Sequence, residues 1–364
     1  MSKLLLAYPQ TELLVTSLPP RTPPDAVLYA AGTFNGWQPG DSAFRMQRQP
    51  DGTWSLRLPA GLKGTAEFKI TRGSWASAEC RPDGSPRPNR VLAFRQDRRV
   101  ELEIEAWADL AAQHSTALPQ VQVLDSAFAM PQLGRSRRIW MYLPASYAHS
   151  GRSYPVLYMH DGQNLFDALT AYAGEWQVDE TLARLEAHSR LELIVVGIDN
   201  GGAHRMNEYA PWVHKRYGGG EGEEYGAFLV ESLKPYIDEH FRTLPDSAHT
   251  AVMGSSMGGL ISFYLALRYP ETFGKAGIFS PSFWFSREAF RFASQYYRGN
   301  RLYFLAGGAE HAMMERGARR MYELLVRHAQ DPAQIRLKVV PDGTHSEAFW
   351  AAELEESLLW LFGR

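Results

Sequence analysis

Five residues in the second half of the chain, Gly254-Ser255-Ser256-Met257-Gly258, have the types and spacing of a nucleophilic site. They fit the pattern G-x-S-x-G, in which the serine sits on a sharp turn between a strand and a helix. The run 249–253 before it is apolar and β-prone, and the run 259–269 after it is helical in pattern and stops at a proline. Glycines on both sides of the serine relieve the crowding of such a strained turn. The sequence therefore predicts that Ser256 is a nucleophile.

A serine hydroxyl needs a base, and the base needs a carboxylate to orient it. His345 lies in a loop between the strand-like run 337–340 and the last helical stretch, where a base is expected. Glu310 follows the strand-like run 302–305, which gives the chain order serine, acid, histidine of α/β-hydrolases. Asp342 is the alternative acid, although its place just before a glycine favours a turn.

The developing oxyanion needs two backbone N–H groups. Met257, the residue after the nucleophile, is predicted to supply one, and Gly162 or Gln163 the other, because both follow the strand-like run 156–159. A metal site at the preceding His-Asp pair is the less favoured alternative, since no further ligands cluster there. This chemistry needs neither a metal nor a cofactor.

The amino-acid composition argues against several classes of function. The 364 residues are 45% hydrophobic and 21% charged, with a net charge of −2, which gives no footprint for nucleic acid or an anionic membrane. The single cysteine, Cys80, excludes an internal disulfide framework and a cysteine-based zinc site. The apolar run at the start is too short for a signal peptide, and no run is long enough to span a bilayer, so the cytoplasm is the expected compartment.

The pattern of apolar and polar residues, which indicates strands and helices, changes once along the chain. Residues 1–106 alternate in short runs between turn clusters, which is typical of a small β-sandwich, and residues 107–119 are a predicted linker. From 120 to 364, apolar strands alternate with helices, which predicts a parallel sheet covered on both faces. The expected strands are 138–143, 156–159, 193–198, 249–253, 276–279, 302–305 and 337–340, and the expected helices lie near 175–187, 222–241, 258–269, 312–329 and 346–362.

The second part resembles the putative esterase family, the esterase D and enterochelin-esterase group of α/β-hydrolases. The resemblance rests on the segments 160–166 (HDGQNLF), 205–209 (RMNEY), 254–259 (GSSMGG), 280–284 (SPSFW), 307–310 (GGAE) and 344–345 (TH). It implies an α/β-hydrolase fold with Ser256 as nucleophile, His345 as base and Glu310 as acid. It also implies that Asn207, Glu208, Tyr209 and Trp284 wall the substrate pocket, with loop packing as the alternative role.

The first part resembles the starch- and glycogen-binding modules of immunoglobulin-like fold. The matching segments are 32–39 (GTFNGWQP), 51–54 (DGTW), 67–75 (EFKITRGSW) and 88–90 (PNR). The resemblance implies that Trp37 and Trp75 stack on sugar rings while Lys69 and Asn89 bond to hydroxyls. Trp54 is expected in the core, and the alternative for the whole module is a docking or lid role without glycan binding.

These patterns together predict a serine carboxylic-ester hydrolase that forms an acyl-enzyme. Its expected partner is a small-molecule or glycan-linked ester, of acetyl or feruloyl type, and neither nucleic acid nor a membrane. One alternative is a siderophore esterase of the enterochelin type, for which Arg205, Lys215 and Arg216 could supply a basic pocket. The other is a glycan-binding protein with an inactive hydrolase domain.

Overall fold

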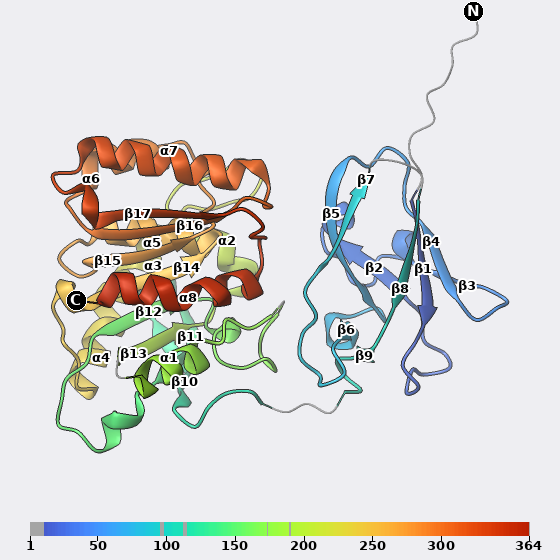
Figure 1. The fold of residues 1–364 in the computed structure, drawn as a ribbon, viewed down its shortest axis with the longest axis horizontal. Helices are drawn as coiled ribbons and strands as arrows, with labels where there is room; N and C mark the ends of the chain where they lie inside the picture. The colour runs from blue at the N-terminus through green and yellow to red at the C-terminus, as the bar shows by residue number, and fades with distance from the viewer. Residues whose placement is uncertain (1–10, 95–97, 112–114, 173, 189–190, 364) are drawn as a thin grey trace, which may run out of the picture. The chain divides into compact units, whose positions relative to one another are not determined.

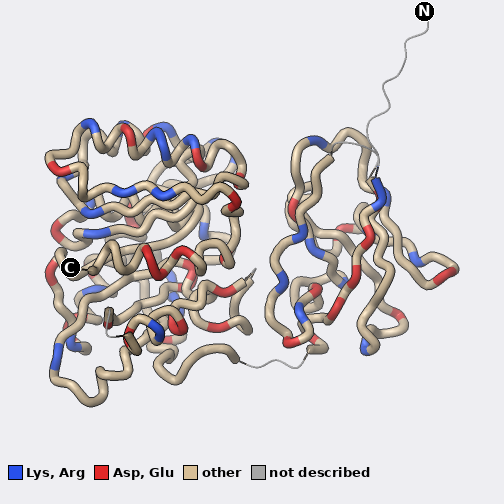
Figure 2. The backbone as a smooth tube through the Cα atoms, viewed as in Figure 1, with Lys and Arg blue, Asp and Glu red and all other residues tan. Residues whose placement is uncertain are grey.

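The computed structural model describes residues 11–94, 98–111, 115–172, 174–188 and 191–363 (Figure 1). The chain divides into two compact units, Met1–Thr116 with Ala171–Gly174 and Ala117–Thr170 with Glu175–Arg364. Basic and acidic residues are interspersed along both units (Figure 2). Among the described residues, no helix has the length and apolar character needed to cross a membrane.

The first unit is rich in β-structure. Its strands are β1 (Thr11–Ser17), β2 (Tyr29–Gly32), β3 (Gln47–Arg48), β4 (Trp54–Arg57), β5 (Gly64–Thr71), β6 (Glu79–Cys80), β7 (Arg90–Phe94), β8 (Arg98–Glu103) and β9 (Ala106–Trp107). They pair as a four-stranded sheet β3-β4-β1-β8, a three-stranded sheet β2-β5-β7 and a short β6-β9 ladder. Its immunoglobulin-like topology stays a prediction.

One apolar core joins the sheets of the first unit. It contains Trp54, as expected, because alternate residues of β4 point inward. It also contains Trp107, whose indole N–H donates to Thr22 Oγ1 at 2.8 Å. Trp107 opens the predicted linker, but in the structure it is buried in this core. The first unit therefore extends beyond the boundary expected at residue 106.

The second unit is built on one eight-stranded sheet. Its strands are β10 (Val121–Met130), β11 (Arg135–Tyr142), β12 (Val156–His160), β13 (Ile194–Ile198), β14 (Thr250–Ser255), β15 (Lys275–Phe279), β16 (Arg301–Gly307) and β17 (Ile335–Val340). Their order is β10-β11-β13-β12-β14-β15-β16-β17, in which β10 and β11 are antiparallel and the strands from β13 onward are parallel. This is the α/β-hydrolase arrangement that the sequence predicted.

Helices cover both faces of this sheet (Figure 1). They are α1 (Val178–Ala187), α2 (Arg205–Glu208), α3 (Gly222–Ala227), α4 (Lys234–His240), α5 (Met257–Arg268), α6 (Glu288–Tyr296), α7 (Ala312–His328) and α8 (Glu347–Phe362). Val156 and Tyr158 of β12 face the core that contains α5 and α7, while Leu157 and Met159 face the core of α1 and α8. This alternation follows from the two-residue period of a strand, with apolar contacts on both sides.

Three elements differ from the sequence prediction. The helix expected over 222–241 consists of α3 and α4 joined by a π-helical segment, Phe228–Leu233, just before Pro235. A proline has no N–H to donate, so a wider turn beside it loses no backbone bond. The short helix α6 and the edge strand β10, most of whose residues are exposed or half-buried, were not predicted.

Candidate active site

The backbone at Ser256 has the strained conformation of a nucleophile elbow. Ser256 lies between β14 and α5 with φ 58° and ψ −118°, a region that costs a non-glycine residue about 1–3 kcal/mol. Its N–H donates to the Phe279 carbonyl of β15 at 2.9 Å, which holds the turn in place. A Cβ atom at Gly254 would lie 2.9 Å from the Gly258 carbonyl carbon, so the tight turn requires glycine at 254.

The predicted acid and base lie beside each other. Glu310 follows β16, His345 lies in the loop between β17 and α8, and the distance from His345 Nδ1 to Glu310 Oε2 is 3.6 Å. The Glu310 side chain has no exposed surface, whereas 32% of the His345 side chain is exposed. Neither of these two atoms has a hydrogen-bond partner among the described residues, so each is available to the other. Asp342, the alternative acid, is exposed at the loop surface.

Two hydrogen bonds that the sequence did not reveal hold the Glu310 carboxylate in place. Ser280 Oγ donates to Glu310 Oε1, and the indole N–H of Trp350 donates to Ser280 Oγ at 2.9 Å. Trp350 also meets the edge of the His345 ring, with centroids 5.0 Å apart and planes at 86°. Ser280 follows β15 at its carboxyl end, a position that could have pointed to it. Glu310 and His345 therefore share Trp350 as a support.

The nucleophile is not bonded to the base. Ser256 Oγ lies 3.3 Å from Ser282 Oγ, and no Ser256–His345 hydrogen bond is present among the described residues. Catalytic hydrogen bonds are often long until a substrate is in place. Ser282 also donates its N–H to the Ser256 carbonyl at 3.0 Å, so the loop after β15 lines the nucleophile.

The predicted oxyanion donors belong to two neighbouring segments, the start of α5 and the turn after β12. Met257 is the first residue of α5, and Gly162 and Gln163 belong to a 3₁₀ turn, Gly162–Asn164, after β12. No acceptor is found for the N–H groups of Met257 and Gln163 among the described residues. A Cβ atom at Gly258 would lie 3.2 Å from Asp161 Oδ2, which brings this turn against the start of α5. A Cβ at Gly162 would lie 2.8 Å from the Ile198 nitrogen, so the loop needs glycine there.

The His160–Asp161 pair is engaged with protein groups. His160 Nδ1 is 2.9 Å from the Tyr225 hydroxyl, and burial lowers the pKa of His160 to about 3, which keeps the ring neutral. The Asp161 carboxylate accepts hydrogen bonds from Arg205 and Asn200. These bonds favour a structural role for the pair over the metal site weighed from the sequence.

Three of the four predicted pocket residues hold loops together. Asn207 Oδ1 accepts from the Gly219 N–H at 2.8 Å, and the Tyr209 hydroxyl accepts from the Asp161 N–H at 3.1 Å. Glu208 is wholly buried and accepts from Arg135 and Arg137 at 2.9 and 2.7 Å. The structure thus favours loop packing over direct substrate contact for these three side chains.

The fourth predicted pocket residue, Trp284, is 37% exposed. Tyr217 is 41% exposed and meets the Trp284 ring edge-on, with centroids 5.6 Å apart. Trp284 lies two residues after Ser282, which contacts the nucleophile. Trp284 therefore lies exposed on the loop that follows β15, with Tyr217 from the segment between α2 and α3 beside it.

The four predicted glycan residues separate into two groups. The Trp37 and Trp75 rings lie together, with centroids 6.1 Å apart and planes at 44°. Lys69 is only 5% exposed, and its ammonium donates to the Arg87 carbonyl; Asn89 donates to Glu67 Oε2 at 3.1 Å. Both tryptophans are half-buried, and the burial of Lys69 differs from the expected exposed hydroxyl contact.

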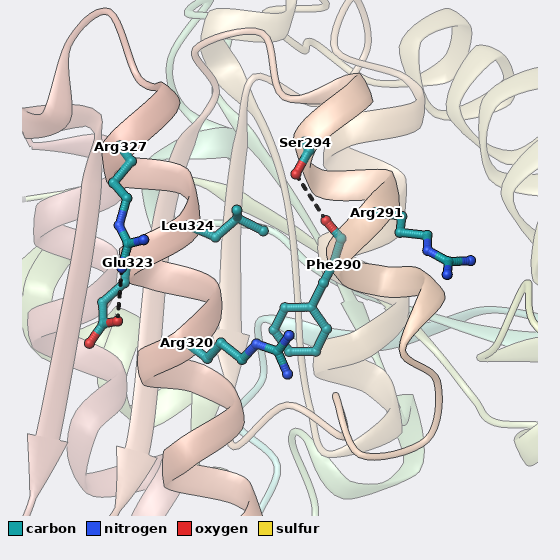
Figure 3. A pocket seen from close by; sticks show the side chains of 7 residues that line it. All are labelled: Phe290, Arg291, Ser294, Arg320, Glu323, Leu324 and Arg327. Atoms are coloured by element: carbon teal, nitrogen blue, oxygen red, sulfur yellow. Dashed lines mark hydrogen bonds and ion pairs between the residues drawn. The ribbon is translucent and has the colours of Figure 1, made fainter.

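A pocket of about 390 Å³ lies between α6 and α7 (Figure 3). Leu324 and Arg320 of α7 project toward Phe290 of α6, and the Arg320 guanidinium carbon lies 4.5 Å from the Phe290 ring centroid. None of the predicted site residues lines this pocket, so it is separate from the elbow.

Comparison with known proteins gives relatives of several kinds. The chain is 26% identical over 244 residues to the uncharacterized protein YbbA of Bacillus subtilis, covering 63% of this chain and 94% of YbbA. It is 25% identical over 246 residues to the iron(III) salmochelin esterase of Escherichia coli O6:H1, covering 65% and 56%. It is 37% identical over 111 residues to an alpha-amylase of Niallia circulans, covering 29% of this chain and 8% of the amylase.

Solved structures share the fold. The enterobactin esterase FES of Shigella flexneri, crystallised with enterobactin, superposes with a TM-score of 0.59 at 19% identity, over 92% of this chain and 87% of that one. A ferulic acid esterase superposes with a TM-score of 0.52 at 20% identity, over 67% and 98%. The family model described as "Putative esterase" matches residues 130–361, which contain the elbow, Glu310 and His345. The chain belongs to this family and is an ester hydrolase with an α/β-hydrolase fold.

Proposed function

We propose that this protein is a serine carboxylic-ester hydrolase that acts through Ser256, His345 and Glu310. The observation that carries the proposal is the strained elbow at Ser256, at the carboxyl end of β14. Strain of this kind persists only where the surrounding structure holds it, and it clusters at functional sites. The adjacent pair of Glu310 and His345 supports the same function, because a buried carboxylate can orient an imidazole and stabilise its charged form.

The reaction proceeds in two halves. Ser256 Oγ attacks the ester carbonyl carbon as His345 takes its proton, and the N–H groups of Met257 and Gln163 or Gly162 bind the oxyanion. The intermediate collapses, and the alcohol leaves with the proton from His345. Water, deprotonated by His345, then attacks the acyl-enzyme and releases the acid. Glu310 accepts the hydrogen bond of the His345 Nδ1–H and stabilises the imidazolium.

The favoured substrate is a carbohydrate-linked ester of acetyl or feruloyl type. The paired Trp37 and Trp75 rings support the carbohydrate part, since indole faces stack on sugar rings. The similarity to an alpha-amylase agrees with this assignment. The exposed Trp284–Tyr217 pair beside the nucleophile loop suits a planar acyl group such as feruloyl.

A siderophore ester is the second candidate, because the chain is similar to a salmochelin esterase over 246 residues. An anionic iron complex would need cations near the nucleophile. Arg205 already donates hydrogen bonds to both carboxylate oxygens of Asp161. The exposed Lys215 and Arg216 are therefore the remaining candidates for binding the anionic complex. The glycan-binding protein with an inactive hydrolase domain is less favoured, since the strained turn at Ser256 and the contact of His345 with the buried Glu310 support catalysis.

A panel of esters tests the substrate. We expect the highest kcat/KM on acetylated xylan or methyl ferulate, lower values on p-nitrophenyl acetate, and the lowest on enterobactin. The released acid is measured by chromatography, with the Ser256→Ala variant as background. A kcat/KM for enterobactin above that of every carbohydrate ester would select the second candidate. Turnover of no ester above the background would contradict the hydrolase proposal.

Retention on insoluble starch tests the first unit. Wild type should be retained, and Trp37→Ala or Trp75→Ala should each weaken retention by about two- to tenfold, since one aromatic stack contributes about 0.5–1.5 kcal/mol. Trp284→Ala, in the other unit, is the matched control and should be retained like wild type. If wild type passes through the starch, the module has only a docking role toward this polysaccharide.

A further inference from the structure

We infer that Arg205 is a positioning residue that sets the oxyanion hole through Asp161, a role that rests on the function proposed above. Arg205 donates from Nε to Asp161 Oδ1 at 2.6 Å and from Nη2 to Asp161 Oδ2 at 2.8 Å. Two parallel bonds between planar groups fix orientation as well as distance. Asp161 directly precedes Gly162 and Gln163, the predicted donors.

The backbone of Asp161 is the reason that it needs support. It adopts the left-handed conformation, φ 58° and ψ 46°, which is uncommon for residues other than glycine, although aspartate adopts it more readily than most. Its dihedral angles determine where the N–H groups of Gly162 and Gln163 point. The Asp161 N–H donates to the Tyr209 hydroxyl, and Asn200 Nδ2 donates to Asp161 Oδ1 at 2.7 Å. Arg205 thus supplies two of the three hydrogen bonds found at the Asp161 carboxylate among the described residues.

The short helix α2 positions both Arg205 and Tyr209, two of the residues that bond to Asp161. Arg205 begins α2 and Tyr209 follows its end, so the two side chains lie on the same side, four residues apart. The Arg205 guanidinium carbon lies 5.0 Å from the Tyr209 ring centroid, which couples them further. Glu208, buried between Arg135 and Arg137, anchors α2 to β11. The loop therefore takes its geometry from a helix that makes no hydrogen bond to Ser256 within the described part of the chain.

The positive charge of Arg205 also compensates the negative charge of Asp161 near the oxyanion site. Asp161 Oδ2 lies close to the start of α5, as the 3.2 Å approach to a Cβ at Gly258 indicates, and therefore close to the place where the oxyanion forms. An unpaired carboxylate there would oppose the developing negative charge. Burial disfavours the charged carboxylate, but the Arg205 guanidinium outweighs it, so the pKa of Asp161 lies below its usual range. Arg205 keeps this carboxylate ionised and electrically compensated.

The rival role for Arg205 is to bind an anionic group of the substrate. The two roles differ in what they change. A positioning residue alters kcat on every ester, including a neutral one, because the oxyanion forms on all of them. A substrate-binding cation alters KM, and only on esters that carry a negative charge.

Steady-state kinetics on neutral p-nitrophenyl acetate tests the inference in the full chain. We expect Arg205→Met to lower kcat by about 10²-fold with KM changed less than about threefold, in line with loss of an oxyanion-hole donor. Arg205→Lys, which keeps the charge but not the paired bonds, should fall between wild type and Arg205→Met. Arg291→Met is the matched control, because Arg291 is 77% exposed and pairs only with Glu288 among the described residues; it should leave kcat unchanged.

A trifluoromethyl ketone supplies a readout that misfolding would not reproduce. Addition of the serine oxygen to this ketone forms an oxyanion, so its inhibition constant should rise in proportion to the loss of kcat/KM across the Arg205 variants. In the double variant Asp161→Asn/Arg205→Met, the loss should be smaller than the product of the two single losses, because the pair acts as a unit.

Two results would overturn the inference. One is an unchanged kcat on p-nitrophenyl acetate in Arg205→Met, together with a raised KM on anionic esters. The other is a loss of kcat that leaves the affinity for the ketone untouched. Failure of the proposed function would look different, since wild type itself would then show no hydrolysis above the Ser256→Ala background.

Discussion

Replacement of Ser256 by alanine is expected to lower kcat for ester hydrolysis by about 10⁴-fold or more. The strained turn would present a methyl group in place of the hydroxyl, so no acyl-enzyme could form. Met257 and Gln163 would still bind the carbonyl oxygen, and the substrate affinity should change little. Initial rates on p-nitrophenyl acetate measure the loss, and a rapid burst of p-nitrophenol is expected on mixing with wild type but not with the variant.

Ser255→Ala is the matched control for this change. Ser255 is the last residue of β14 and belongs to the same five-residue motif, but its backbone is that of a strand. We expect its kcat to stay within about threefold of wild type, because the hydroxyl removed is not the attacking group. An inactive Ser255→Ala enzyme beside an active Ser256→Ala enzyme would show that the wrong serine was assigned.

The second large effect is expected at Glu310. Glu310→Gln should lower kcat by about 10²- to 10⁴-fold, because a neutral amide cannot stabilise the imidazolium of His345 and can hold the ring in the wrong tautomer. The buried position of Glu310 leaves no water to replace the carboxylate. The bond from Ser280 would remain available to the amide oxygen, so the fold should survive. Stopped assays on p-nitrophenyl acetate and a thermal melt separate these two effects.

Asp342→Asn is the comparison that decides which carboxylate serves the base. Asp342 is exposed, and no contact with His345 is found among the described residues, so this variant should keep wild-type kcat. Full activity in Glu310→Gln with loss in Asp342→Asn would reverse the assignment. Loss of activity in both would mean that the loop, rather than one carboxylate, sets the base.

The part of the site that the sequence predicted is the part encoded locally. The apolar run before Ser256, the helical run after it and the order of Glu310 and His345 are all properties of short segments. The carboxyl ends of parallel strands meet at one edge of a sheet, so the pattern of strands was sufficient to bring these segments together.

The remainder depends on long-range packing. Nothing near Ser280 or Trp350 in the sequence indicates that they meet across 70 residues to hold Glu310. The burial of Glu208 requires Arg135 and Arg137, which come from a strand about 70 residues earlier. A lysine such as Lys69 could donate a hydrogen bond to a sugar hydroxyl, but its ammonium donates instead to the Arg87 carbonyl within the first unit. Residue type alone could not distinguish these supporting roles from contact with a ligand.

The loop after β17 crosses the end of β16 on its way toward the nucleophile. Ala309 donates its N–H to the Gly343 carbonyl at 3.0 Å, and a Cβ at Gly307 would lie 2.2 Å from that oxygen. β17 and β14 are separated by β15 and β16, which at about 4.8 Å per strand amounts to about 14 Å. The connection from Val340 to His345 does not run extended across this distance, because Gly343 donates its N–H to the Val340 carbonyl at 3.0 Å and so closes a turn. This turn and its contact with the residues after β16 set the path of the chain into His345, so either an insertion or a deletion within 341–344 is expected to move the imidazole away from Glu310.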